Sequence, residues 1–180
     1  MMPAWLKSAR TSATIGSLAA LATLVALTVV ATLALCFGLS LLVAAVESQA
    51  VAWPSAGHLA VSVGAGFLVM GMWALTGFLL GTVARGPALS VGLGLVWALV
   101  VENLLRGVGE LLGAVEVFTR VLPGTSAGSL VGSIVGVGGP DPTPGVLEVL
   151  TGPQATAVLA AYVLALPVVT LIVVRHRDVA

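Results

Sequence analysis

The sequence predicts an all-α, polytopic helical membrane protein with about four transmembrane helices and an external amphipathic or re-entrant region. Of its 180 residues, 59% are hydrophobic and only 8% are charged, whereas an ordinary soluble domain is about 25% charged. The charged residues are also unevenly distributed along the chain. None lies between Arg10 and Glu47, between Glu47 and Arg85, or between Glu148 and Arg175. A charge at the centre of a spanning helix costs about 2.5–3.5 kcal/mol, so these windows indicate lipid-crossing segments.

The remaining composition narrows the class of protein. Seven basic and seven acidic residues balance, and no basic stripe of the kind that nucleic acid needs is present, so we expect no nucleic-acid partner. The single cysteine, Cys36, excludes a disulfide within the chain. The uncharged run from Thr11 to Val46 is longer than the apolar region of a signal peptide, so we expect a retained span.

The lengths of the windows predict the spans, because about 20 apolar residues cross the hydrocarbon core. We expect the first span to be one long helix that tilts or projects, since no polar residues near Phe37 and Gly38 could form a turn. Trp53 and Pro54 suit an interface and a helix start. The predicted parts are a cytoplasmic segment 1–14, spans 15–46, 57–80, 87–101 and 154–174, an extracytoplasmic region 102–153, and a cytoplasmic tail 175–180.

The extracytoplasmic region begins with an amphipathic stretch, 102–122, in which apolar residues recur at helical spacing. Opposite charges four residues apart can pair on a helix surface. These pairs are Glu102 with Arg106, Arg106 with Glu110, and Glu116 with Arg120. We therefore expect an amphipathic helix that lies at an interface or packs on its neighbours, and that Pro123-Gly124 breaks.

Two overlapping Gly-x-x-x-Gly units follow, formed by Gly128, Gly132 and Gly136. Small residues four apart let helices approach closely. The run is too short and too rich in glycine for an independent span, so it predicts a re-entrant or surface half-helix.

Basic residues predict the orientation. Lys7 and Arg10 precede the first span, Arg85 lies in the second loop, and Arg175 and Arg177 follow the last span. The first loop has no basic residue, and the third connection has two arginines but five acidic residues. By the positive-inside rule, both termini and Arg85 are cytoplasmic.

The sequence carries no nucleotide or metal motif. Its only lysine is Lys7, so no Gly-x-x-x-x-Gly-Lys loop exists. His58 and His176 are isolated from each other, which disfavours a zinc site. No charged base lies within a span to activate a serine. We therefore expect no enzymatic activity, no cofactor and no metal.

Three groups of residues are candidates for function. Glu102, Arg106 and Glu110 could form an external gate, although the simpler interpretation is an interfacial ion pair that ends the third span. Lys7, Arg10 and Arg85 could contact a cytoplasmic partner or serve only as topology anchors. Pro167 removes a helical hydrogen bond and should bend the fourth span, either as a hinge or as a structural kink. Tyr162 could line a pathway or simply pack.

The stretch from Gly77 to Gly92, with its short basic loop at Arg85, resembles part of the permease subunits of bacterial type-2 ATP-binding-cassette exporters. There it matches the fourth span, the loop and the fifth span. Leu95–Glu102 is similar to the fifth span of that family, and Leu122-Pro123 resembles the Leu-Pro after its external amphipathic helix. The ending 175–179 is similar to the tail after the last span, so the resemblance covers most of the chain from about residue 15.

The resemblance implies alternating access, in which cytoplasmic ATPase subunits drive two permease halves in a bacterial inner membrane. The partners would be an ATP-binding-cassette ATPase, a second permease chain in a homo- or hetero-oligomer, and membrane lipid. Such permeases usually have six spans, so the four here would be the third to the sixth, and the first two are missing. A small non-transporting membrane protein for assembly, scaffolding or immunity is the main alternative, and a membrane enzyme has the weakest support.

Overall fold

The fold is all-helical, and four of its helical segments are long and apolar enough to cross a membrane. The computed structural model describes residues 4–51, 53–84, 86–109, 112–136, 143 and 145–177, with backbone only for 4–11, 113, 114 and 177. The four apolar segments are Ser12–Val46, Ala56–Val83, Pro87–Gly109 and Gly152–His176. The predicted fold class is confirmed.

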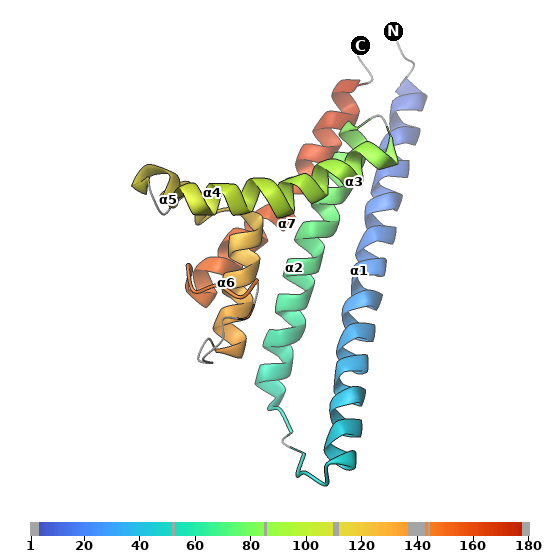
Figure 1. Cartoon of the computed structure of the whole chain (residues 1–180). Coiled ribbons are helices and arrows are strands. Elements are labelled where there is room, and N and C mark those ends of the chain that lie inside the picture. The colour runs from blue at the N-terminus through green and yellow to red at the C-terminus, as the bar shows by residue number, and fades with distance from the viewer. Residues whose placement is uncertain are drawn as a thin grey trace.

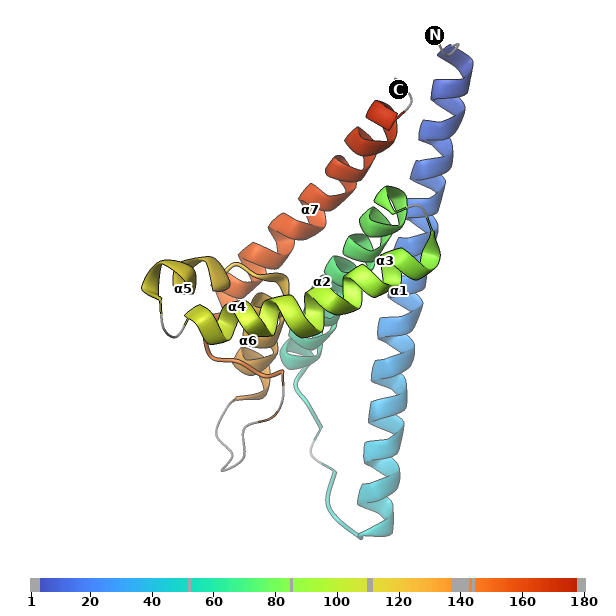
Figure 2. The ribbon, with the colours of Figure 1, turned by 45° about the horizontal axis from the view of Figure 1, so that its top comes forward.

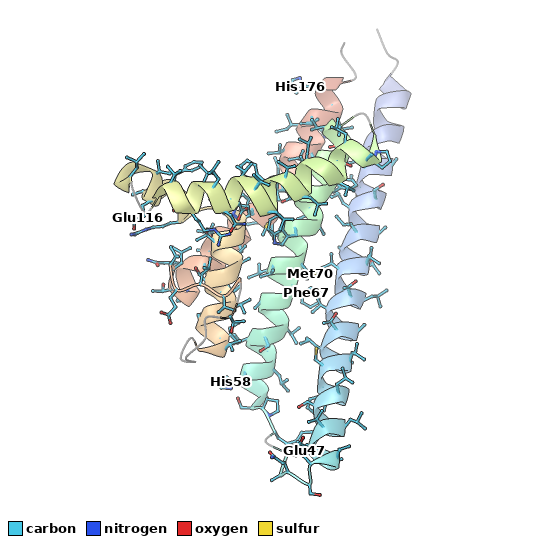
Figure 3. The ribbon with its side chains drawn as sticks, in the orientation of Figure 1. Glu47, His58, Phe67, Met70, Glu116 and His176 are labelled. Carbon is cyan, nitrogen blue, oxygen red and sulfur yellow. The ribbon has the colours of Figure 1, made fainter. Side chains whose placement is uncertain are left out.

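The first two apolar segments form a long antiparallel hairpin of α1 (Ala4–Val46) and α2 (Ala56–Val83) (Figure 1). The first segment is a single helix, as predicted from the absence of turn residues. The side chain of Ser55 accepts a hydrogen bond from the backbone N–H of His58 at 3.2 Å and so caps the start of α2. Glu47 and His58 lie at one end of the hairpin, and His176 lies at the opposite end of the molecule (Figure 3).

The third apolar segment is one bent run of helix. It consists of α3 (Pro87–Val96), a five-residue π turn η1 (Trp97–Val101) and α4 (Glu102–Gly109), which follow one another without leaving helical backbone angles. Two views show this run lying crosswise to α1 and α2 (Figures 1 and 2). The helix therefore continues past the predicted end of the span at residue 101.

A single amphipathic helix over 102–122 was a wrong expectation. The stretch forms α4 and a separate short helix, α5 (Gly113–Thr119), and the intervening Leu112 has an extended backbone. Glycines at 107, 109 and 113 weaken the helix here, because each costs about 1 kcal/mol relative to alanine. The helix is therefore interrupted between α4 and α5.

The last two helices, α6 (Pro123–Val135) and α7 (Gly152–Arg177), pack against each other and against α2. Their shared core contains Met72 of α2, Leu130 of α6 and Leu159 of α7, each at most 4% exposed. Both termini lie at the same end of the molecule, and the turn between α2 and α3 lies toward that end (Figure 1). Pro167 lies inside α7, which continues through it as one helix.

Candidate functional site

Glu102 is the one acidic residue within the four apolar segments. Its side chain is only 1% exposed, at the point where the π turn passes into α4. An ionisable residue buried in a membrane-spanning helix is costly, and for that reason it marks a functional site more often than other residues do. The contacts of its carboxylate therefore define the candidate site.

One oxygen of this carboxylate accepts two hydrogen bonds. Glu102 Oε1 lies 3.1 Å from the indole Nε1 of Trp97 and 3.2 Å from the backbone nitrogen of Gly124. The bond to Trp97 depends on the π turn, in which residues five apart come together, as the backbone N–H of Glu102 on the carbonyl of Trp97 also shows. The bend in the third apolar segment thus orients the glutamate.

Gly124 is the second residue of α6, so the carboxylate sits at the start of that helix. The first N–H groups of a helix have no partner within the helix. Pro123 has no N–H, and the side chain of Leu122 at the N-cap position makes no capping hydrogen bond. The negative group also suits the positive end of the helix dipole. Glu102 therefore caps α6 from a different helix.

The fit between the two helices is tight. A Cβ atom placed on Gly124 would collide with Oε2 of Glu102. Glycine at position 124 is thus required for the close approach of carboxylate and helix backbone.

Further polar groups lie near the start of α6. We call Glu102, Val121, Gly124, Thr125 and Tyr162 together the α6 corner. The hydroxyl of Tyr162 in α7 donates to the carbonyl of Val121 at 3.0 Å, which ties the approach to α6 onto α7. Thr125 Oγ1 is buried and has no hydrogen-bond partner in the part of the chain that the structure describes. The corner is therefore held by Glu102 and Tyr162 and leaves one hydroxyl unsatisfied.

The predicted ion pair between Glu102 and Arg106 is not formed. The Arg106 side chain instead donates to the side-chain oxygen of Asn103 at 3.1 Å and to the backbone carbonyl of Glu102 at 3.4 Å. The reason is that the carboxylate points inward to Trp97 and Gly124. Glu110, the third member of the predicted gate, lies outside the described residues. The predicted pair of Glu116 and Arg120 is confirmed, at 2.8 Å.

The small residues of α6 pack against an irregular segment of the chain. A Cβ on Gly128 would lie 2.5 Å from the carbonyl oxygen of Gly145, and Leu147 donates its N–H to the carbonyl of Gly128 at 3.1 Å. The Ser129 hydroxyl accepts from the N–H of Leu150 at 3.2 Å. Glycine allows the close approach that the Gly-x-x-x-Gly pattern predicts, but the partner of Gly128 is this segment and not another helix.

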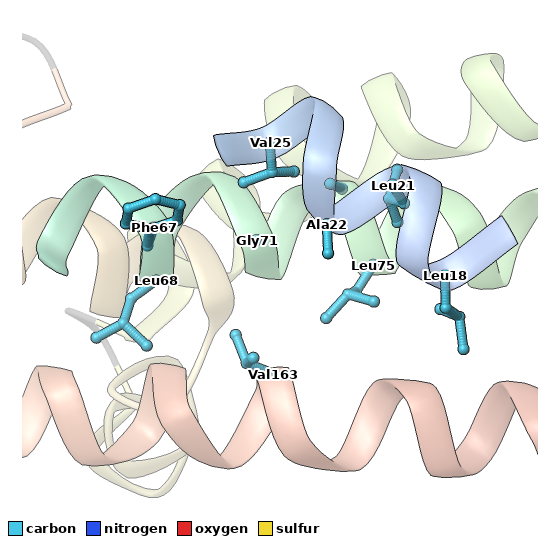
Figure 4. Close-up of a pocket in the computed structure, with 10 residues that line it drawn as sticks. Leu18, Leu21, Ala22, Val25, Phe67, Leu68, Gly71, Leu75 and Val163 are labelled. Carbon is cyan, nitrogen blue, oxygen red and sulfur yellow. The ribbon is translucent and has the colours of Figure 1, made fainter. Parts of the chain in front are cut away.

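A separate apolar cavity of about 330 Å³ lies between α1, α2 and α7 (Figure 4). Its lining carries no polar side chain: Leu18, Leu21, Ala22, Val25, Phe67, Leu68, Gly71, Ala74, Leu75 and Val163. The spacing of apolar residues did not reveal it, because these helices are apolar on every side. Such a lining suits an apolar group and offers nothing to a charged one.

The candidate partner-contact residues are placed only in part. Lys7 and Arg10 lie in the first turns of α1, at the end of the molecule where both termini lie (Figure 1). Arg85 is outside the described residues, between α2 and α3. Among the described residues, no three His, Cys, Asp or Glu side chains gather where they could share a metal ion.

Comparisons of the chain with models of protein families, with curated proteins and with solved structures found no match.

Proposed function

We propose that this chain is the transmembrane permease subunit of an ATP-driven exporter in a bacterial inner membrane. The observation that carries the proposal is the arrangement of the third connection. The short helices α5 and α6 stand between the third apolar segment, which ends with α4, and the last long helix α7, and α6 is buried against α2 and α7. The resemblance to type-2 permeases implies short external helices at this position.

The source of energy must be another chain, because the sequence has no phosphate-binding loop. The termini and the turn between α2 and α3 lie toward one end of the molecule (Figure 1), and the positive-inside rule favours the cytoplasm for that end. Lys7, Arg10 and Arg85 are among the basic residues that this end would offer to an ATPase subunit.

The cargo that fits this proposal is apolar or amphipathic. The cavity between α1, α2 and α7 has a wholly apolar lining, and three of the four apolar segments carry no acidic residue. A lipid, a hydrophobic drug or an apolar peptide could enter such a path without leaving a charge unpaired.

Co-purification in mild detergent tests the proposal. We expect an ATP-binding-cassette ATPase to be retained, and the charge reversal Arg85→Glu to reduce its recovery several-fold. The matched control is Glu47→Lys, a charge reversal in the loop at the opposite end of the α1–α2 hairpin, which should leave recovery unchanged. If no ATPase is retained and proteoliposomes containing the chain show no ATP-dependent transport, the chain is a non-transporting membrane protein.

Thiol labelling of intact cells tests the orientation separately. In a Cys36→Ala background, Ser55→Cys and Thr143→Cys should react with an impermeant maleimide from outside, and Gly86→Cys should react only after permeabilisation. The reverse pattern would overturn the assignment of both termini to the cytoplasm.

A further inference from the structure

Helix α6 is weak by its own sequence. Three glycines and four serine or threonine residues occupy seven of its 13 positions, and these residue types favour helix less than alanine or leucine does. An isolated helix of this length is marginal even with the best helix formers. The helix must therefore draw its stability from what packs on it and what caps it.

The cap of α6 comes from Glu102, in the helical run that lies crosswise to α1 and α2. Glu102 is 22 residues away from Gly124 in the sequence, and it supplies the acceptor that the N-cap residue Leu122 does not supply. We propose that Glu102 is a conformational latch: when α4 is docked, its carboxylate orders the first turn of α6, and when α4 moves away, that turn opens. The proposal does not depend on whether the chain is a permease subunit.

Two features make the docked position of α4 adjustable. The π turn Trp97–Val101 is a departure from regular helix of the kind that recurs at functional sites, and the chain breaks again around Leu112. Helix α4 is thus a short helix with a departure from regular α-helical backbone near each end. The buried, unpaired hydroxyl of Thr125 lies within the turn that would open, and opening would allow it to find a partner.

Thiol reactivity of the first turn measures the opening. Ser126 is fully buried and its hydroxyl makes only a long bond of 3.4 Å to the Arg120 carbonyl, so Ser126→Cys in a Cys36→Ala background reports exposure of this turn. We expect Glu102→Ala to raise its maleimide labelling rate about tenfold in detergent or nanodiscs, the usual scale for loss of an N-cap. Glu102→Gln should raise it less, because the amide oxygen still accepts.

Two controls separate the latch from general loosening. The first is the buried reporter Thr170→Cys in α7, whose labelling rate should not change with Glu102→Ala. The second is Leu104→Ala on the exposed face of α4, which should leave the Ser126→Cys rate unchanged. An unchanged Ser126→Cys rate in Glu102→Ala, or an equal rise at both reporters, would overturn the latch.

A double substitution then tests the contact itself. Gly124→Ala should raise labelling of the Ser126→Cys thiol in the parent, because the added methyl group expels the carboxylate. In the Glu102→Ala background the same change should have little further effect, since nothing is left to expel. An equal factor in both backgrounds would show that the two residues act independently, and the proposal would fail.

Discussion

The α1–α2 hairpin and helix α6 differ in which kinds of side chain they bury. Leu24, Leu27 and Leu35 of α1 are more than 60% exposed, and only Val25 and Val29 are buried among its described side chains. In α6, by contrast, eight residues are buried, and most of them are small or polar: Pro123, Thr125, Ser126, Ala127, Gly128, Ser129, Leu130 and Gly132. The long apolar helix α1 is therefore much less packed within the chain than the short helix α6, which is rich in small and polar residues.

This difference in packing follows from the lipid environment that such apolar helices require. In lipid, burying a leucine between helices gains little over leaving it against an acyl chain, so association depends on close packing and on hydrogen bonds. Small residues allow that packing, and serine, threonine and glutamate supply the bonds. The exposed leucines of α1 are then a surface for lipid or for another membrane chain, and α6 packs within the chain through its small and polar residues.

Substitutions in the shared core should show the largest contrast. Met72 is fully buried, so Met72→Ala should lower the free energy of unfolding by about 2–4 kcal/mol through the cavity that it leaves. Leu24→Ala in α1 removes a comparable side chain that touches little protein and should change it by less than about 0.5 kcal/mol. Denaturant titration in detergent compares them, and equal losses would mean that α1 is packed as tightly as α2.

Two glycines should respond with opposite signs. Gly128→Ala places a methyl group against the Gly145 carbonyl and should cost about 1–3 kcal/mol by overpacking. Gly38→Ala lies in α1 with open space around it and should stabilise the helix by about 0.5–1 kcal/mol. Thermal unfolding of the two variants measures this difference. A loss of oligomer in Gly38→Ala alone would instead mark that face of α1 as a contact with a second chain.

Composition and residue spacing predict those features of the fold that depend on neighbouring residues alone. The windows without charges predicted α1, α2 and α7, because apolar length alone decides whether a helix can cross lipid. The pairing of Glu102 with Arg106 was mispredicted although both residues lie in the α-helix α4, because the preceding π turn brings the Trp97 indole to the carboxylate, which points inward. The bond to Gly124 joins distant segments, so only the folded arrangement reveals it.

Removing the indole donor should weaken the corner moderately. Trp97→Phe keeps most of the ring volume but leaves Glu102 Oε1 with one donor in place of two. The expected loss is about 1 kcal/mol, the usual net value of a hydrogen bond, and somewhat more because the acceptor is charged. Trp73→Phe in α2 is the matched control, since no side-chain hydrogen bond to Glu102 involves it among the described contacts. Equal effects in the two variants would mean that ring packing alone matters at position 97.

Glu102 at the start of α4 and Glu116 within α5 should differ most clearly in the kind of interaction that they make. Glu116 pairs with Arg120 one helical turn away, and both side chains are about half exposed, so screening by water and salt leaves such a pair little to contribute. Glu116→Gln should change the free energy of unfolding by no more than about 0.5 kcal/mol, and raising the salt concentration should remove that change. The effect of Glu102→Ala should persist at high salt, because the carboxylate itself is buried and its partners are N–H groups rather than an exposed charge. If the Glu102→Ala effect also disappeared in salt, the carboxylate would be acting through exposed charge, and the contrast between the two glutamates would be wrong.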